Sequence, residues 1–97
     1  MIVLPMFLDQ ECEPQLAFWT TDGAIVRTLR HLASAIEGMR DYSFQYHVNK
    51  DHNKNDFADW IRDVIKDDEL AMRLEGVMEK NKYISIIRAR LRELNAK

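Results

Sequence analysis

Apolar residues recur in the second half of the chain with the spacing of amphipathic helices. The clearest set stands at positions i, i+3, i+4, i+7 and i+8 and consists of Phe57, Trp60, Ile61, Val64 and Ile65. Because 3.6 residues complete one helical turn, this spacing places all five on one face. Asn55 or Asp56 stands just before them and suits the N-cap, where a short polar side chain accepts a hydrogen bond from a free backbone N–H group. The pattern predicts a helix with Phe57 and Trp60 in the core.

Three more apolar stripes predict three further helices. Their residues step by three and four positions, and the helices cover about 25–39, 70–78 and 83–94. The first stripe is formed by Ile25, Leu29, Leu32, Ile36 and Met39. Thr21 or Asp22 is suited to cap the helix at about 25–39, and Asp67 or Asp68 is suited to cap the helix at about 70–78. One core can bury the apolar faces of all four helices.

Two short segments have the character of strands. "QLAFWTT" is rich in aromatic and β-branched residues and runs into the turn sequence "TTDG", and "SFQYHV" alternates Phe44, Tyr46 and Val48 with polar residues. The sequence therefore predicts a mainly α fold, with about four amphipathic helices packed around one core and a minor two-stranded β element near residues 15–20 and 43–48. Neighbouring side chains of a strand face opposite sides, so Phe18 and Trp19 cannot both be buried, and we assign Trp19 to an interaction surface.

Composition limits the number of domains. A chain of 97 residues, 46% of them apolar, encloses a single core, which we place in residues 15–97. Before it come an apolar segment, "MIVLPMFL" (1–8), and an acidic linker (9–14). The apolar segment has neither the basic leader of a signal peptide nor the length of a membrane span, so we expect it to pack on the body or on a neighbouring subunit. The single cysteine, Cys12, fits an unpaired thiol in the reducing cytoplasm.

One stretch of the sequence resembles a known family. "FQYHV" and the following "NDFADWIRDVIKDDELAMRL" are similar to domain of unknown function 5752, and the upstream "FWTTDG" extends the similarity to about residues 16–94. The matching positions include Phe44, Tyr46, His47, Asn55, Asp56, Phe57 and Trp60. The resemblance implies a small, mainly helical module that occurs alone or attached to larger proteins, and it implies no reaction. "KDHNK" lengthens the polar loop relative to the family pattern, so His52 is particular to this chain.

The polar cluster around His47 offers the most specific candidate for a metal site. Imidazole nitrogens bind zinc, copper or nickel, and a carboxylate adds oxygen, so His47, His52 and Asp56 form a weak candidate site. The spacing of five between the histidines does not match a helix face, and the composition between them is that of a loop. We favour a His47 that is hydrogen-bonded to backbone or to Asp56 and a His52 in solvent. No catalytic or cofactor-binding residue and no cofactor is predicted.

Charge is unevenly distributed between the last two helical regions. Residues 56–70 hold six acidic and two basic side chains, a balance of −4, whereas residues 80–97 hold six basic and one acidic, a balance of +5. Arg88, Arg90 and Arg92 lie beside the apolar stripe of the last helix and could meet the acidic helix of the same chain, the same helix of a second copy, or phosphates. Because the net charge is −2, contact with protein is favoured over contact with nucleic acid.

The function expected from these observations is that of a non-enzymatic cytoplasmic module. We expect it to act through protein contacts, as a homo-oligomer or with a protein partner, and not on membranes. One alternative is a nucleic-acid-binding protein that uses the basic last helix. A second alternative is a metal-dependent enzyme built on the histidines and aspartates of the polar loop.

Overall fold

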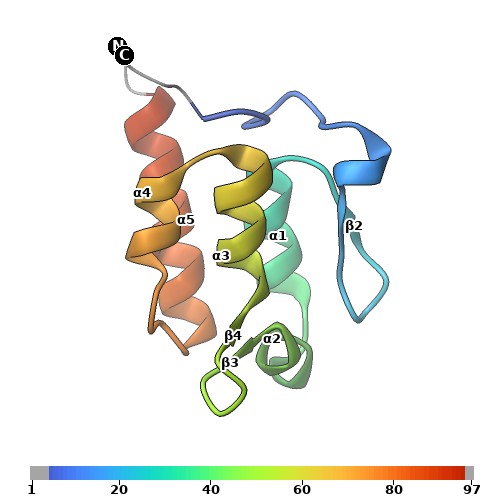
Figure 1. The fold of residues 1–97 in the computed structure, drawn as a ribbon, viewed down its shortest axis with the longest axis vertical. Coiled ribbons are helices and arrows are strands. Elements are labelled where there is room, and N and C mark those ends of the chain that lie inside the picture. The colour runs from blue at the N-terminus through green and yellow to red at the C-terminus, as the bar shows by residue number, and fades with distance from the viewer. Residues whose placement is uncertain (1–4, 96–97) are drawn as a thin grey trace.

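A computed structural model of the chain describes residues 5–95, and it is mainly helical (Figure 1). The helical elements are η1 (Pro14–Leu16), α1 (Leu29–Gly38), α2 (Asp41–His47), α3 (Asp56–Trp60), the π-helical turn η2 (Ile61–Ile65), α4 (Asp68–Arg73) and α5 (Lys80–Asn95). The strands form two short antiparallel hairpins, β1 (Phe18–Trp19) with β2 (Ile25–Val26), and β3 (Val48–Asn49) with β4 (Lys54–Asn55). The predicted mainly α fold with a minor β component is confirmed.

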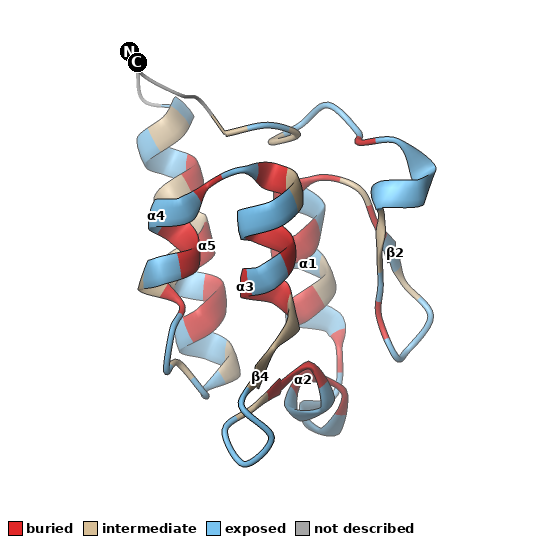
Figure 2. Cartoon of the chain, in the orientation of Figure 1, coloured by how far each residue is buried: buried red, intermediate tan, exposed pale blue. Residues whose placement is uncertain are grey.

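The core lies between the helices that stand upright in Figure 1. The buried residues of α1, α3, η2 and α5 turn toward the interior, as the red segments of Figure 2 show. α1 packs against α5, and α4 packs against both α5 and η2. Helix α2 lies across their lower ends, next to the β3–β4 hairpin (Figure 1). No helix between residues 5 and 95 is long and apolar enough to cross a membrane.

Both caps predicted for the second half of the chain are confirmed. The Asn55 side chain accepts a hydrogen bond from the backbone N–H of Ala58, and the Asp67 side chain accepts one from Leu70. Phe57 is fully buried and Trp60 nearly so. The helix that they begin continues as the π-helical turn η2, which ends at Lys66 in the left-handed conformation, with φ of 66°. Local sequence signals therefore located the starts of these elements correctly, but α4 ends at Arg73 and not near residue 78, so Val77 and Met78 lie outside the helix.

The strand predicted at 43–48 is wrong, because residues 41–47 form α2. The apolar alternation suggested that Phe44, Tyr46 and Val48 share a buried face. In the structure the buried residues of this helix are Ser43, Phe44 and His47, while Tyr46 is 57% exposed. Ser43 and Phe44 lie four and three residues before His47, so the three share one face of a helix, and the Phe44 ring packs against the core. Only Val48 continues into a strand.

The partner of the first strand and the start of the first long helix also differ from the prediction. β1 pairs with β2, so that Phe18 lies opposite Val26 and Trp19 opposite Ile25. Ile25 is therefore in a strand, and α1 begins at Leu29 with Thr28 as its cap, whose side chain accepts from the His31 backbone N–H. The turn "TTDG" closes a hairpin because Gly23 adopts a φ of 96°, which a residue without a Cβ tolerates.

The described part of the N-terminal segment packs on the helical body. The backbone N–H of Met6 donates to the Ile65 carbonyl at 2.6 Å, and the carbonyls of Phe7 and Leu8 accept from the first residues of α1. The side chains of Phe7 and Leu8 pack against the core, and the thiol of Cys12 is buried. Packing was predicted for the whole segment 1–8, of which residues 1–4 lie outside the described part of the chain.

Candidate functional site

His47 lies at the junction of three elements and uses both ring nitrogens within the protein. Its Nδ1 is 3.0 Å from Oδ2 of Asp56 at the start of α3, and its Nε2 accepts the backbone N–H of Thr21 in the β1–β2 turn at 3.1 Å. Since Nε2 accepts, the hydrogen of the neutral ring is on Nδ1 and is donated to Asp56. The side chain is only 5% exposed. The prediction that His47 bonds to backbone or to Asp56 is confirmed for both partners.

The surroundings of His47 hold its ring in one orientation. Phe18 of β1 meets it edge-on at 5.1 Å between ring centroids, and Phe57 lies at 5.0 Å. On the solvent side, Lys54 sits 3.7 Å from the ring centroid of Tyr46 and 3.4 Å from the Asp56 carboxylate. A general base needs a lone pair that faces substrate, but the Nε2 lone pair of this ring is already engaged. The arrangement joins α2, α3 and the β1–β2 hairpin.

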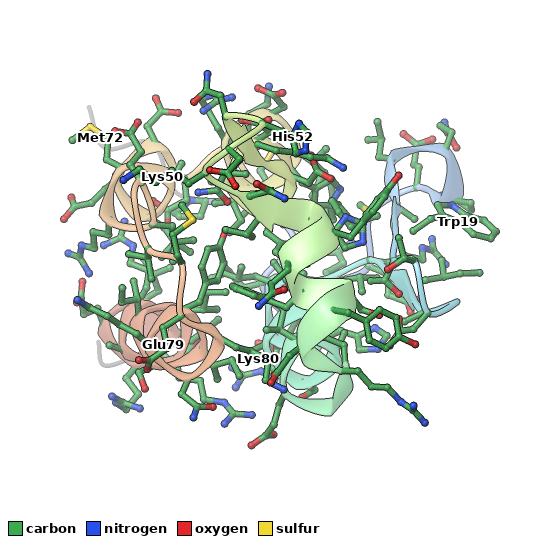
Figure 3. The ribbon with its side chains drawn as sticks, turned by 90° about the horizontal axis from the view of Figure 1, so that it is seen from below. Trp19, Lys50, His52, Met72, Glu79 and Lys80 are labelled. Carbon is green, nitrogen blue, oxygen red and sulfur yellow. The ribbon has the colours of Figure 1, made fainter. Side chains whose placement is uncertain are left out.

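The structure does not bring the third candidate ligand, His52, into a cluster with His47 and Asp56. His52 lies exposed in the turn between β3 and β4 (Figure 3). In the part of the chain from Pro5 to Asn95, no group of three or more histidine, cysteine, aspartate or glutamate side chains is arranged to hold a metal ion. Of the candidate site, only the His47–Asp56 pair exists as a contact.

Asn55 forms a second junction that the sequence indicated only in part. Besides capping α3, its Oδ1 accepts the hydroxyl of Tyr83 on α5 at 2.5 Å, and its Nδ2 donates to the Leu74 carbonyl after α4 at 3.1 Å. Tyr83 is completely buried, and this burial raises the pKa of its phenol, so that the hydroxyl remains a donor. Neither Tyr83 nor Leu74 is near Asn55 in sequence, and the motif contains no signal for these two contacts.

Two of the three arginines predicted to form an interaction surface bind carboxylates of the same chain. Arg90 contacts Asp67 through Nε at 2.8 Å and through a terminal nitrogen at 3.0 Å, and the hydrogen bonds from Asp67 raise the pKa of the Arg90 guanidinium. Arg88 donates to Glu37 of α1 at 2.9 Å. Arg92 is exposed at the end of α5. The charge asymmetry seen in the sequence thus serves contacts within the fold, including the Asp67–Arg90 pair between the α4 cap and α5.

Trp19 lies on the outer face of the β1–β2 hairpin. It is 66% exposed, and its cross-strand neighbour Ile25 is 44% exposed, whereas Phe18 on the other face packs onto Phe57. Figure 3 shows Trp19 projecting away from the helical body. The expectation that Phe18 and Trp19 face opposite sides is confirmed, and the outward residue is Trp19.

Comparison with known proteins identifies a family. A family model described as a family of unknown function (DUF5752) matches residues 20–95, which confirms the resemblance predicted for about residues 16–94. No curated protein and no solved structure matches the chain. The matched span runs from the β1–β2 turn to the end of α5 and includes His47, Asn55 and Asp56. The chain therefore belongs to this family of unknown function, DUF5752.

Proposed function

We propose that this chain is a non-enzymatic cytoplasmic module that acts through protein contacts and self-associates through the outer face of the β1–β2 hairpin. The observation that carries the proposal is the pair of exposed apolar side chains there, Trp19 and Ile25, which stand directly opposite each other. Tryptophan is among the residues most enriched at the energetic centres of protein interfaces. Two large apolar side chains side by side form a continuous patch that water solvates poorly.

The hairpin presents this patch on a rigid support. The Thr20 hydroxyl bonds to Asp22 within the turn, and the Ala24 N–H donates back to the Thr20 hydroxyl at 2.9 Å. On the protein side of the hairpin, His47 accepts the backbone N–H of Thr21 in the turn, and Phe18 packs on Phe57. A surface that is ordered before contact loses less conformational entropy on binding. This preorganisation favours an interface over an accidental exposure of Trp19.

A second copy is the partner that this patch fits best. In a twofold contact the same patch is used by both copies, so Trp19 of one copy would cover Ile25 of the other. A large aromatic side chain buries about 150–250 Å². A standard interface buries about 800 Å² per partner, so the hairpin face alone supports only a weak dimer. We therefore expect self-association that depends on concentration over the micromolar to millimolar range.

The polar side chains that could take part in catalysis support a non-enzymatic role. Both nitrogens of His47 are engaged, and none of the buried side-chain nitrogen or oxygen atoms in residues 5–95 lacks a hydrogen-bond partner. An unpaired buried donor or acceptor aimed into a cavity is a frequent sign of a site that awaits a ligand. Arg90 is held by the buried carboxylate of Asp67, so it is not free to contact phosphates, which weighs against the nucleic-acid alternative.

Sedimentation equilibrium over a wide range of protein concentration tests the proposal. The weight-average mass should rise toward that of a dimer, and the variant Trp19→Ser should remain monomeric. Tyr42→Ser is the matched control, because Tyr42 is equally exposed, at 68%, but lies on α2. A wild-type protein that stays monomeric at the highest concentration, or a Trp19→Ser variant that associates as well as the wild type, would show that the hairpin is not the contact surface.

A further inference from the structure

A groove of about 660 Å³ lies between α1 and α5, away from the hairpin face. Its polar lining consists of Arg30, Ser34, Arg88, Arg92 and Asn95. Ala33 and Leu91, which are nearly completely buried, form its apolar floor. Among residues 5–95, no carboxylate lines this groove, although the chain as a whole has a net charge of −2. The groove lining is therefore positively charged on an acidic protein, with two of its three arginines paired to carboxylates at the margins and the third, Arg92, exposed.

The arginines of this groove already bind carboxylates at its margins. Arg30 donates through Nε to Asp9, and Arg88 donates to Glu37 at 2.9 Å. Both pairs are largely exposed, and exposed pairs contribute little free energy, so a competing carboxylate can share or replace them. Within the described part of the chain, the terminal nitrogens of Arg30 and the whole guanidinium of Arg92 make no hydrogen bond. Donors suited to carboxylates therefore remain open in the groove.

The donors follow a helical repeat on both walls. Arg30 and Ser34 are four residues apart on α1, and Arg88 and Arg92 are four residues apart on α5. Residues with this separation lie about one helical turn, or roughly 6 Å, apart. Carboxylates four residues apart on another helix have the same repeat. An apolar side chain between them would meet the floor formed by Ala33 and Leu91.

We propose that this groove binds an acidic amphipathic helix of a partner protein, with carboxylates one turn apart facing the arginines. Charge complementarity carries the choice of partner. A nucleic-acid strand would bring a continuous row of phosphates close to Asp9 and Glu37 at the margins, whereas acidic side chains on a helix are spaced and leave room for these carboxylates. This inference goes beyond the proposed self-association, because no residue of the β1–β2 hairpin lines the groove.

The test uses a fluorescently labelled synthetic peptide of about 18 residues, long enough to populate a helix, with glutamates four residues apart beside leucines. Fluorescence anisotropy at low ionic strength should show saturable binding, and a peptide with glutamine in place of glutamate should bind at least about tenfold more weakly. The variant Arg92→Gln should lose about tenfold in affinity, because each charge-assisted hydrogen bond contributes roughly one decade. Arg62→Gln is the matched control, because Arg62 is an exposed, ion-paired arginine outside the groove.

Three results would overturn the proposal. The first is the absence of saturable binding of the acidic peptide, or equal binding by Arg92→Gln. The second is a single-stranded RNA of similar length that binds more tightly than the peptide and displaces it. The third is loss of self-association in Arg92→Gln, which would make a second copy the occupant. Trp19→Ser should bind the peptide normally, so failure of the hairpin contact is distinguishable from failure of the groove.

Discussion

Replacement of Asn55 by alanine tests how much one side chain contributes at the junction of three helices. The amide caps α3, accepts the hydroxyl of Tyr83 and donates to the Leu74 carbonyl. Loss of an N-cap costs about 1 kcal/mol. A buried hydroxyl left without its partner adds about 1–2 kcal/mol. We therefore expect Asn55→Ala to lower the free energy of unfolding by roughly 2–3 kcal/mol, a large fraction of the 5–15 kcal/mol typical of a domain.

Urea denaturation followed by far-ultraviolet circular dichroism measures this change. The control is Asn81→Ala, because Asn81 is exposed in the first turn of α5 and its replacement should change the stability by less than about 0.5 kcal/mol. A double-mutant cycle with Tyr83→Phe separates the hydroxyl contact from the cap. With the hydroxyl removed, Asn55→Ala should cost about 1 kcal/mol less than it does in the wild type. A stability of Asn55→Ala close to that of the wild type, or strict additivity in the cycle, would refute the reasoning.

Two further substitutions test other parts of the fold. His47→Ala should destabilise the protein by about 3 kcal/mol, because it removes a buried ring together with two hydrogen bonds. The control His52→Ala, in the exposed turn, should change thermal stability by less than about 0.5 kcal/mol. Equal effects of the two substitutions would contradict the structural role of His47. Lys66→Gly should stabilise the protein by about 0.5–1 kcal/mol, because glycine adopts the left-handed conformation of this position without strain. Lys82→Gly within α5 should instead destabilise it by about 1 kcal/mol, and a loss of stability in both glycine variants on chemical denaturation would disprove the argument for Lys66.

The two proposed surfaces give the module separate ways to make contacts. The hairpin face presents exposed apolar side chains, while the α1–α5 groove presents guanidinium groups over a small apolar floor. Contacts of the first kind weaken little with salt, whereas those of the second kind weaken strongly as ionic strength rises. Salt dependence therefore distinguishes them in a single series of measurements. A module with two independent surfaces can link a copy of itself to another protein.

Several features that depend on neighbouring residues were predicted correctly from the sequence, although the first long helix begins at Leu29 with Thr28 as its cap rather than near Ile25. The helix at Phe57, its cap at Asn55 and the cap at Asp67 were located because capping and apolar spacing act over one or two turns. The outward position of one residue in the pair Phe18 and Trp19 followed from the geometry of a strand. In the same way, the family resemblance followed from a continuous stretch of sequence and was confirmed over residues 20–95.

The tertiary structure decided what local patterns leave open. Residues 41–47 are as compatible with a strand as with a helix when only their alternation is considered, and packing of Phe44 and His47 against the core selects the helix. The pattern of charges along α5 does not show that Arg90 forms an ion pair with the buried Asp67, that Arg88 pairs with Glu37 at the surface, or that Arg92 stays exposed. These outcomes depend on contacts between residues far apart in the chain, whose free energy exceeds the small local preferences. The sequence by itself determined the helix at Phe57 and the caps at Asn55 and Asp67, because these depend on residues within one or two turns. Only the packed structure determined that residues 41–47 are helical, where α1 begins, and which polar groups are engaged.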